Sequence, residues 1–276
     1  MGRLYLVATP IGNLEDLSPR AERILREAIL IAAEDTRQTM KLLTHFDIHT
    51  SLTSYFEHNK MKKLEAILAA LTQGDVALVS DAGTPAINDP GYELVRAALQ
   101  AGHTISPIPG PCAPMAALAA SGLPTDAFLY LGYLPRRSPD RQGLLEQIAG
   151  LPYTLVFLET PHRLLAGLAD LEACLGDRQI AIARELTKIH EEIWRGTISA
   201  ARAHFASNEP RGEFTLVVAG RSKTEKQEWK EEQVRFAIKT GLENGENLSA
   251  MAKKLSEESG WERREIYKLA IFYQKR

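Results

Sequence analysis

The sequence has few of the residues that form disulfide bonds and metal centres. It contains only two cysteines, Cys112 and Cys174, among 276 residues, which excludes a disulfide framework. The seven histidines do not stand at ligand spacing from a cysteine or a carboxylate, so we expect no metal site. Because thiols are so scarce, we expect a reducing compartment, the cytoplasm.

Long apolar runs and common enzyme signatures are missing too. No run approaches the roughly 20 apolar residues that cross a bilayer, so we expect no membrane partner. A strand-like run at residues 4–7 begins without a basic and then apolar leader, so we expect no signal peptide. The Gly-x-Gly-x-x-Gly fingerprint, the P-loop and the Gly-x-Ser-x-Gly elbow are absent, which argues against the usual dinucleotide-binding, P-loop and α/β-hydrolase enzymes.

Charge is nearly balanced but unevenly placed. The formal net charge of −2 argues against a protein that coats nucleic acid through bulk charge. Residues 221–276 carry 13 Lys and Arg against 10 Asp and Glu, and the rest of the chain is acidic. Such unevenness more often reflects solvation than binding, so it leaves the partner open.

What is present predicts an α/β protein of several domains. The hydrophobic fraction of 45% and the charged fraction of 25% are ordinary for globular proteins. Strand-like and helical runs alternate over residues 1–120, which predicts a parallel-type sheet. A second α/β domain with a mixed sheet is expected at 121–222, since its later strands are too closely spaced for crossover helices. We expect a helical C-terminal domain at 226–276, in which Ser259 and Gly260 join two helices.

Small and polar residues follow four strands of the first predicted sheet. The strongest segment is 79–91, and the others are 8–16, 33–37 and 107–113. Because carboxyl ends of parallel strands meet at one edge of a sheet, these segments predict a pocket for a small, polar and partly apolar ligand. A rigid turn is the alternative for segment 79–91.

Several charged or reactive residues have two interpretations. Glu34, Asp35 and Arg37 form either part of a site or an internal salt bridge. Cys112 is a reactive thiol or, more often at such a position, a small buried hydrophobe. A group of arginines in the second domain is either a solvated face or a phosphate contact, namely Arg136, Arg137 and Arg141.

Taken in order, these segments resemble the tetrapyrrole (corrin/porphyrin) methylase family, and within it the branch that acts on ribosomal RNA. The resemblance is carried by residues 6–14, 33–37, 78–91, 109–113, 121–124, 183–188 and 212–214. It implies the two-domain tetrapyrrole-methylase fold with S-adenosylmethionine in the cleft between the domains, and usually a homodimer. It also implies methyl transfer to the ribose 2′-hydroxyl of a decoding-centre cytidine in 16S rRNA of the small ribosomal subunit.

The resemblance also implies a set of cofactor-binding residues drawn from both domains. Carried over position by position, they are Pro10, Ser80, Asp81, Ala82, Gly83, Cys112, Ala113, Leu158, Glu159, Leu186, Phe214 and Thr215. Corrin-branch members typically have glycine at the position of Ser80, and this departure fits the ribosomal branch.

The family does not supply the group that accepts the hydroxyl proton. We hypothesise that Glu34, Asp35 or Glu185 accepts it, with Arg37 and Lys188 binding phosphate or orienting the carboxylate. A second set of basic residues, in the helical tail, is expected to contact RNA phosphates: Arg263, Arg264 and Lys268.

Two other functions stay open at this point. An enzyme of the same fold could methylate a carbon of a small corrin precursor, which would have no need of the helical tail. A nucleotide-sensing protein could instead use the same cleft without turnover.

Overall fold

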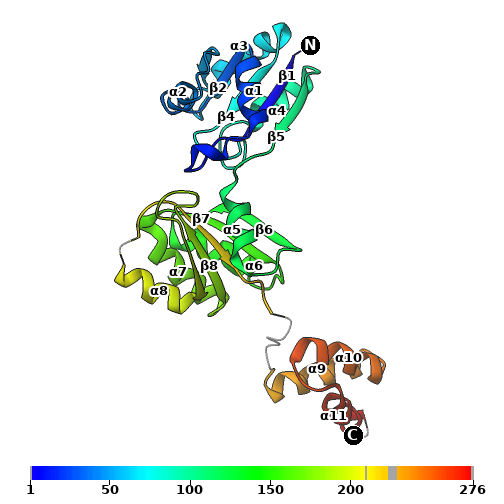
Figure 1. The fold of residues 1–276 in the computed structure, drawn as a ribbon. Coiled ribbons are helices and arrows are strands. Elements are labelled where there is room, and N and C mark those ends of the chain that lie inside the picture. Colours follow the sequence, from blue (N-terminus) through cyan, green and yellow to red (C-terminus); the bar gives the residue numbers. More distant parts are fainter. Residues whose placement is uncertain (1, 209, 223–228, 275–276) are drawn as a thin grey trace. The chain divides into compact units, whose positions relative to one another are not determined.

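A computed structural model describes residues 2–208, 210–222 and 229–274 (Figure 1). The chain separates into two compact units. One comprises Met1–Gln147 with Tyr153–Ala219, and the other comprises Ile148–Pro152 with Gly220–Arg276. Residues 226–228 and 275–276, which the sequence assigned to the helical domain, lie outside the described residues. The three domain boundaries drawn from the sequence stay a prediction.

The larger unit contains two five-stranded sheets. The first has the order β3-β2-β4-β1-β5, and every neighbouring pair is parallel. Its strands are β1 (Arg3–Val7), β2 (Leu30–Ala33), β3 (Leu52–Ser54), β4 (Val76–Val79) and β5 (Thr104–Ile108). Its helices are α1 (Pro19–Glu27), α2 (Thr36–His45), α3 (Lys60–Gln73) and α4 (Tyr92–Gln100), with a short 3-10 helix η1 (Leu14–Asp16) after β1.

Both faces of this sheet are buried, and all four residues of β4 are apolar and buried. Ala77 and Val79 face one core, to which α1 and α2 contribute, while Val76 and Leu78 face the other, to which α3 and α4 contribute. Helix α1 is N-capped by Ser18, whose hydroxyl accepts a hydrogen bond from the Ala21 amide at 3.1 Å. Because helices cover both faces of the sheet, its carboxyl edge is lined by loops.

The second sheet is mixed, as expected, with the order β6-β7-β10-β8-β9. The pair β6–β7 is parallel and the other pairs are antiparallel. Its strands are β6 (Phe128–Tyr133), β7 (Thr154–Glu159), β8 (Gln179–Arg184), β9 (Glu192–Thr197) and β10 (Phe214–Val218). Its helices are α5 (Ala113–Ser121), α6 (Ser138–Ile148), α7 (Pro161–Leu175) and α8 (Ile198–Ser207).

Helix α5 packs against the second sheet although it directly follows β5 of the first. Ala117 and Leu118 share a core with Val156, Ala181 and Val217 of the second sheet. The sequence analysis assigned residues 1–120, which include most of this helix, to the first domain. Small side chains let the helix lie close on the strands, which a sequence pattern alone does not reveal.

The smaller unit is helical. It contains α9 (Glu231–Glu243), α10 (Leu248–Ser259) and α11 (Arg263–Gln274), which share a core around Val234, Met251 and Ile266. The predicted tight turn between the last two helices is confirmed, because Gly260 adopts a left-handed φ of 78° at the end of α10. Across the described part of the chain, no helix combines the length and the apolar character that a bilayer crossing needs.

Candidate functional site

A cleft lies at the carboxyl edge of the first sheet. Each of the four loops singled out from the sequence contributes to its lining, through Ile11, Glu34, residues 81–84 and Cys112. The loops after β1 and β4 are tied together, because the backbones of Thr9 and Gly83 exchange two hydrogen bonds of 2.9 Å. The expectation that these loops form one pocket is therefore confirmed.

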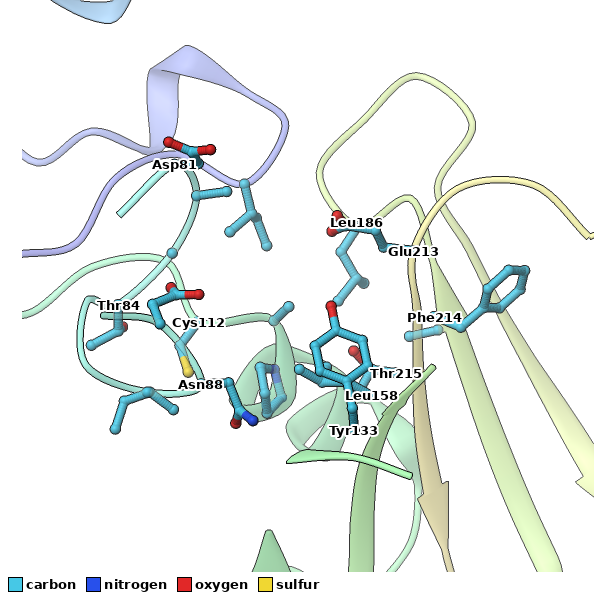
Figure 2. Close-up of a pocket in the computed structure, with 18 of the residues that line it drawn as sticks. Asp81, Thr84, Asn88, Cys112, Tyr133, Leu158, Leu186, Glu213, Phe214 and Thr215 are labelled. Carbon is cyan, nitrogen blue, oxygen red and sulfur yellow. The ribbon is translucent and has the colours of Figure 1, made fainter. Parts of the chain in front are cut away.

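The second sheet supplies the other side of the same cleft (Figure 2). The cavity has a volume of about 230 Å³. Strand β7 contributes Leu158 at its end, and β6 contributes Tyr130 and Tyr133. The end of β8 and the loop after it contribute residues within 183–188, and the start of β10 contributes residues 213–215. Apolar and charged groups thus meet around one space, a composition common in small-molecule sites.

The predicted site residues divide into two groups in the structure. Twelve line the cleft: Glu34, Asp81, Ala82, Gly83, Cys112, Ala113, Leu158, Glu185, Leu186, Lys188, Phe214 and Thr215. Pro10, Asp35, Arg37, Ser80 and Glu159 are not among the lining residues. The functional roles of all of them stay predictions.

The residues outside the lining have local structural contacts that explain their positions. Asp35 caps α2, because its carboxylate accepts a hydrogen bond from the Arg37 amide at 2.8 Å. The Arg37 guanidinium pairs with the same carboxylate at 2.6 Å and is otherwise solvated. Hydrogen bonds from Arg37 lower the pKa of Asp35 to about 2, so the internal salt bridge is the interpretation that the structure supports.

Glu159 and Phe214 turn their side chains into the protein. The Glu159 carboxylate is fully buried, accepts a hydrogen bond from the Thr160 amide at 2.8 Å and pairs with Arg163 at 3.3 Å. The Phe214 ring points away from the cleft and packs edge-on against Phe205, with ring centroids 5.7 Å apart (Figure 2). Phe214 therefore presents its backbone to the cleft.

Two cleft loops hold each other through backbone-to-carboxylate hydrogen bonds. The Asp81 carboxylate accepts a hydrogen bond from the Asp35 amide at 2.9 Å, and Glu34 accepts one from the Asp81 amide at 3.3 Å. Figure 2 shows the Asp81 carboxylate at the rim of the cleft, where this bond holds it. Burial raises the pKa of Glu34 and the pKa of Asp81.

On the opposite side, Glu185 and Lys188 form an ion pair of 2.9 Å. Their loop contacts the loop after β1 tightly, since a Cβ on Gly12 would lie 2.4 Å from Lys188 Cγ. Glu185 and Thr187 have positive φ angles of 50° and 65°. A left-handed conformation is costly for a β-branched residue and marks a segment held by its surroundings, as is common at binding sites.

Sequence reasoning assigned no role to the two tyrosines. Tyr130 and Tyr133 are three residues apart on β6 and would point to opposite faces of a regular strand. The register of β6 shifts between them, and Gly132 adopts a φ of 63° within the irregularity. This bulge brings both rings into the cleft, as bulges beside active sites often do. A glycine inside a strand pattern was the available signal.

Asp89 and Glu213 also line the cleft. Both lie within segments that the sequence analysis singled out, but neither received a role there. Burial raises the pKa of Asp89 to about 6, and the nearby charge of Glu34 acts in the same direction. Together with Glu34, Asp81 and Glu185, they give the cleft a lining in which carboxylates outnumber the ammonium group of Lys188.

The arginine group of the second domain is not a uniform basic face. Arg141 is buried and donates to the Asp170 carboxylate at 2.7 Å. Hydrogen bonds from Gln142, Ser138 and Arg141 overcome the effect of burial and lower the pKa of Asp170. Arg136 and Arg137 are exposed, so a phosphate contact at this surface would depend on them and not on Arg141.

The family model for tetrapyrrole (corrin/porphyrin) methylases matches residues 3–202. The chain belongs to the tetrapyrrole methylase family. A relative in Synechocystis sp., named ribosomal RNA small subunit methyltransferase I, is 48% identical over 273 residues, which cover 98% of each chain. A relative in Thermotoga maritima with the same name is 46% identical over 222 residues, which cover 80% of this chain and 100% of that protein.

A solved structure with a similar fold contains a bound ligand. The Thermus thermophilus uroporphyrin-III C-methyl transferase complexed with S-adenyl homocysteine has a TM-score of 0.54 and 21% identity, covering 78% of this tetrapyrrole methylase and 97% of that chain. At such low identity the likeness shows the fold alone. The predicted fold class, with its parallel sheet, mixed sheet and helical C-terminal extension, is thereby confirmed.

Proposed function

We propose that this family member is an S-adenosylmethionine-dependent methyltransferase that modifies the ribose 2′-hydroxyl of a decoding-centre cytidine in 16S rRNA. The observation that carries the proposal is the 48% identity to a ribosomal RNA small subunit methyltransferase I over 98% of both chains. The alternative substrate is a small corrin precursor. Its support comes from solved structures of low sequence identity, and such a likeness shows the fold and not the substrate.

The residues of the cleft fit the methyl donor. Gly83 has a φ of 83°, and a Cβ there would approach the Ile11 side chain at 3.4 Å, so glycine keeps backbone accessible beside Ala82. Ile11, Leu158 and Leu186 offer apolar surface to an adenine ring. The acidic lining suits a ligand that carries a sulfonium and an ammonium group.

S-adenosylmethionine would supply an electrophilic methyl group on its positively charged sulfur. The contribution of the protein is then to align the attacking oxygen, the methyl carbon and the sulfur, and alignment alone can supply much of the rate. Loops pinned by the Asp35–Asp81 hydrogen bond and by the left-handed residues Glu185 and Thr187 provide such a rigid frame.

The acidic cleft places a requirement on the RNA. Phosphate groups are repelled by its carboxylates, so the backbone must be bound by basic residues outside it. In the larger unit Arg37 is exposed beside the cleft loops. In the smaller unit the predicted RNA contacts Arg263, Arg264 and Lys268 are all exposed on α11, in keeping with the role proposed for them.

The proposal is tested by methyl transfer from tritiated S-adenosylmethionine to small ribosomal subunits and, separately, to free 16S rRNA lacking the modification. Nuclease digestion and chromatography should recover the label as 2′-O-methylcytidine. Label on another nucleoside, or on a corrin precursor offered in parallel, would overturn the substrate. Donor binding in calorimetry without transfer to any acceptor would instead favour a sensing protein.

We further propose that the protein works as a homodimer, as its family resemblance implies. Light scattering coupled to size exclusion should give about twice the chain mass of 30.6 kDa. A monomer mass at micromolar concentration would contradict this part of the proposal.

A further inference from the structure

Among the residues that the structure describes, the Asp89 carboxylate of the cleft has no ion-pair partner. Asp89 lies in the loop between β4 and α4 and lines the cavity with Cys112, Tyr130 and Tyr133. Within the described ranges, no arginine, lysine or histidine forms an ion pair with it. Asp89 can therefore accept a proton without first breaking an ion pair.

Four other acidic residues near the cleft already have a hydrogen-bond or ion-pair partner. Glu185 pairs with Lys188 at 2.9 Å, and the Asp35 carboxylate is bound by the amide and guanidinium of Arg37. The Glu34 carboxylate accepts a hydrogen bond from the Asp81 amide. The Asp81 carboxylate in turn accepts a hydrogen bond from the Asp35 amide. A group whose negative charge is already stabilised by such bonds is a weaker proton acceptor.

The surroundings of Asp89 make it a stronger base than an ordinary carboxylate. Burial raises its pKa to about 6. The ionisable groups that face it come from several elements: Glu34, Asp81, Glu213, Tyr130 and Tyr133. All are anionic or neutral at physiological pH, so none holds the charge of Asp89 in place. A pKa just below the working pH is the condition under which general-base catalysis is most effective.

We propose that the Asp89 carboxylate accepts the ribose 2′-hydroxyl proton during methyl transfer, an inference that rests on the proposed function. In this step the 2′-oxygen forms a bond to the methyl carbon while the carbon–sulfur bond breaks. The electron pair of that bond stays on sulfur, which becomes a neutral thioether, and the hydroxyl proton passes to an Asp89 oxygen. Charge is conserved, because one sulfonium and one carboxylate are neutralised together.

Two neighbours position this carboxylate. The buried Ser80 hydroxyl hydrogen-bonds to it and thereby lowers its pKa. The carbonyl oxygens of Ala82 and Gly83 lie 3.5 Å and 3.4 Å from the same hydroxyl, but a carboxylate is the stronger acceptor for its single proton. The residue before Asp89, Asn88, has a φ of 62° and packs on Gly132, which fixes where the chain turns. Ser80 is thus a positioning residue for Asp89.

The pH dependence of single-turnover methyl transfer to small subunits tests the assignment. For the wild type, the rate should rise with pH through about 6, the pKa of Asp89. Asp89→Asn should lower the rate about 10²- to 10⁴-fold, the usual contribution of a general base, and abolish this rise. Ser80→Ala removes a hydrogen bond to the charged form, so it should move the rise to higher pH with a smaller loss of rate.

Asp126→Asn is the matched control, because Asp126 is exposed and is not among the lining residues. It should leave the rate and the pH profile unchanged. Melting temperatures of each variant establish that it is folded. A wild type that methylates 2′-hydroxyls, together with an Asp89→Asn variant of equal rate and profile, would overturn the inference alone. A wild type that transfers no methyl group to RNA would overturn the proposed function and the inference with it.

Discussion

The Asn88 side chain packs against the backbone of Gly132, so that a loop of the first sheet contacts the bulge of the second. A Cβ on Gly132 would lie 2.3 Å from Asn88 Nδ2, far inside contact distance. Both residues also have left-handed φ angles, 62° and 63°. The position of Tyr133, the residue after Gly132, depends on this contact.

Gly132→Ala should therefore impair both folding and the cleft. A left-handed alanine costs about 1–2 kcal/mol, and the clash with Asn88 adds to that, so we expect a loss of about 2–3 kcal/mol in unfolding free energy, measured in urea. Gly122→Ala is the control, because Gly122 has a φ of 79° but a Cβ added to it would meet nothing within 4 Å. Equal losses in the two variants would show that the Asn88 contact is unimportant.

Asp89→Asn should stabilise the protein at neutral pH while it removes activity. The folded-state pKa of Asp89, about 6, is above its ordinary value of 3.8, so the folded protein loses stability as pH rises through this range. Well below pH 3.8 the group is protonated in both states and the variant should match the wild type. Near pH 7 we expect the variant to gain about 1 kcal/mol, since partial solvent exposure screens the full effect of the shift.

Thermal melts from pH 4 to pH 8 check this prediction. The difference in melting temperature between Asp89→Asn and wild type should grow with pH. Asp126→Asn again provides the comparison, and it should show no such trend. A difference that shrinks with rising pH would contradict the assigned direction.

Arg141→Met should destabilise the protein without weakening binding of the donor or of RNA. Removing the arginine leaves the Asp170 carboxylate buried without its ion partner, and breaking a buried pair from one side costs about 3–5 kcal/mol. Arg137→Gln is the control, because its side chain is 79% exposed. Chemical unfolding measures both variants. If Arg141→Met left stability intact but weakened RNA binding, the phosphate-contact interpretation would be restored.

Charge removal on α11 should weaken RNA binding without affecting the donor site. In the variant Arg264→Ala with Lys268→Ala, each lost phosphate contact should reduce the salt dependence of RNA affinity by about one unit of slope. Lys62→Ala, on an exposed position of α3, is the control. Filter binding over a salt series and calorimetry with S-adenosylmethionine measure the two effects.

Removal of residues 226–276 should weaken RNA binding more than the double substitution on α11 does, again without affecting the donor site. The Thermotoga maritima relative is matched over its whole length by 222 residues of alignment, which leaves about a fifth of this chain unmatched. Unchanged RNA affinity after either change would rule out a role for α11.

Much of the fold could be predicted from the sequence, because its signals were local. The mixed second sheet and the turn at Ser259 and Gly260 between two helices were each found at the expected place. The gathering of loops at the carboxyl edge followed from parallel strands alone. The packing of α5 on the second sheet could not be foreseen, since Ala-rich helices carry little directional pattern.

The site was predictable in outline and not in its side-chain directions. Segment 79–91 was identified, yet nothing in its pattern says that Asp89 lies in the cleft or that Ser80 is buried beneath it. The second tyrosine, Tyr133, depends on a register shift that only the structure reveals. Phe214 faces away because aromatic packing with Phe205 is more favourable than exposure. Such choices arise from three-dimensional contacts that sequence spacing does not contain.

The surplus of carboxylates around the cleft has a consequence for turnover. An acidic site attracts a cationic donor from a distance and holds it by charge, whereas the spent donor has lost its sulfonium charge. The part of the electrostatic affinity that comes from the sulfonium therefore disappears with the reaction itself, while the ammonium group keeps its own attraction. Glu34, Asp81 and Glu213 would in this way help the enzyme to exchange used donor for fresh donor, and salt would reduce that advantage.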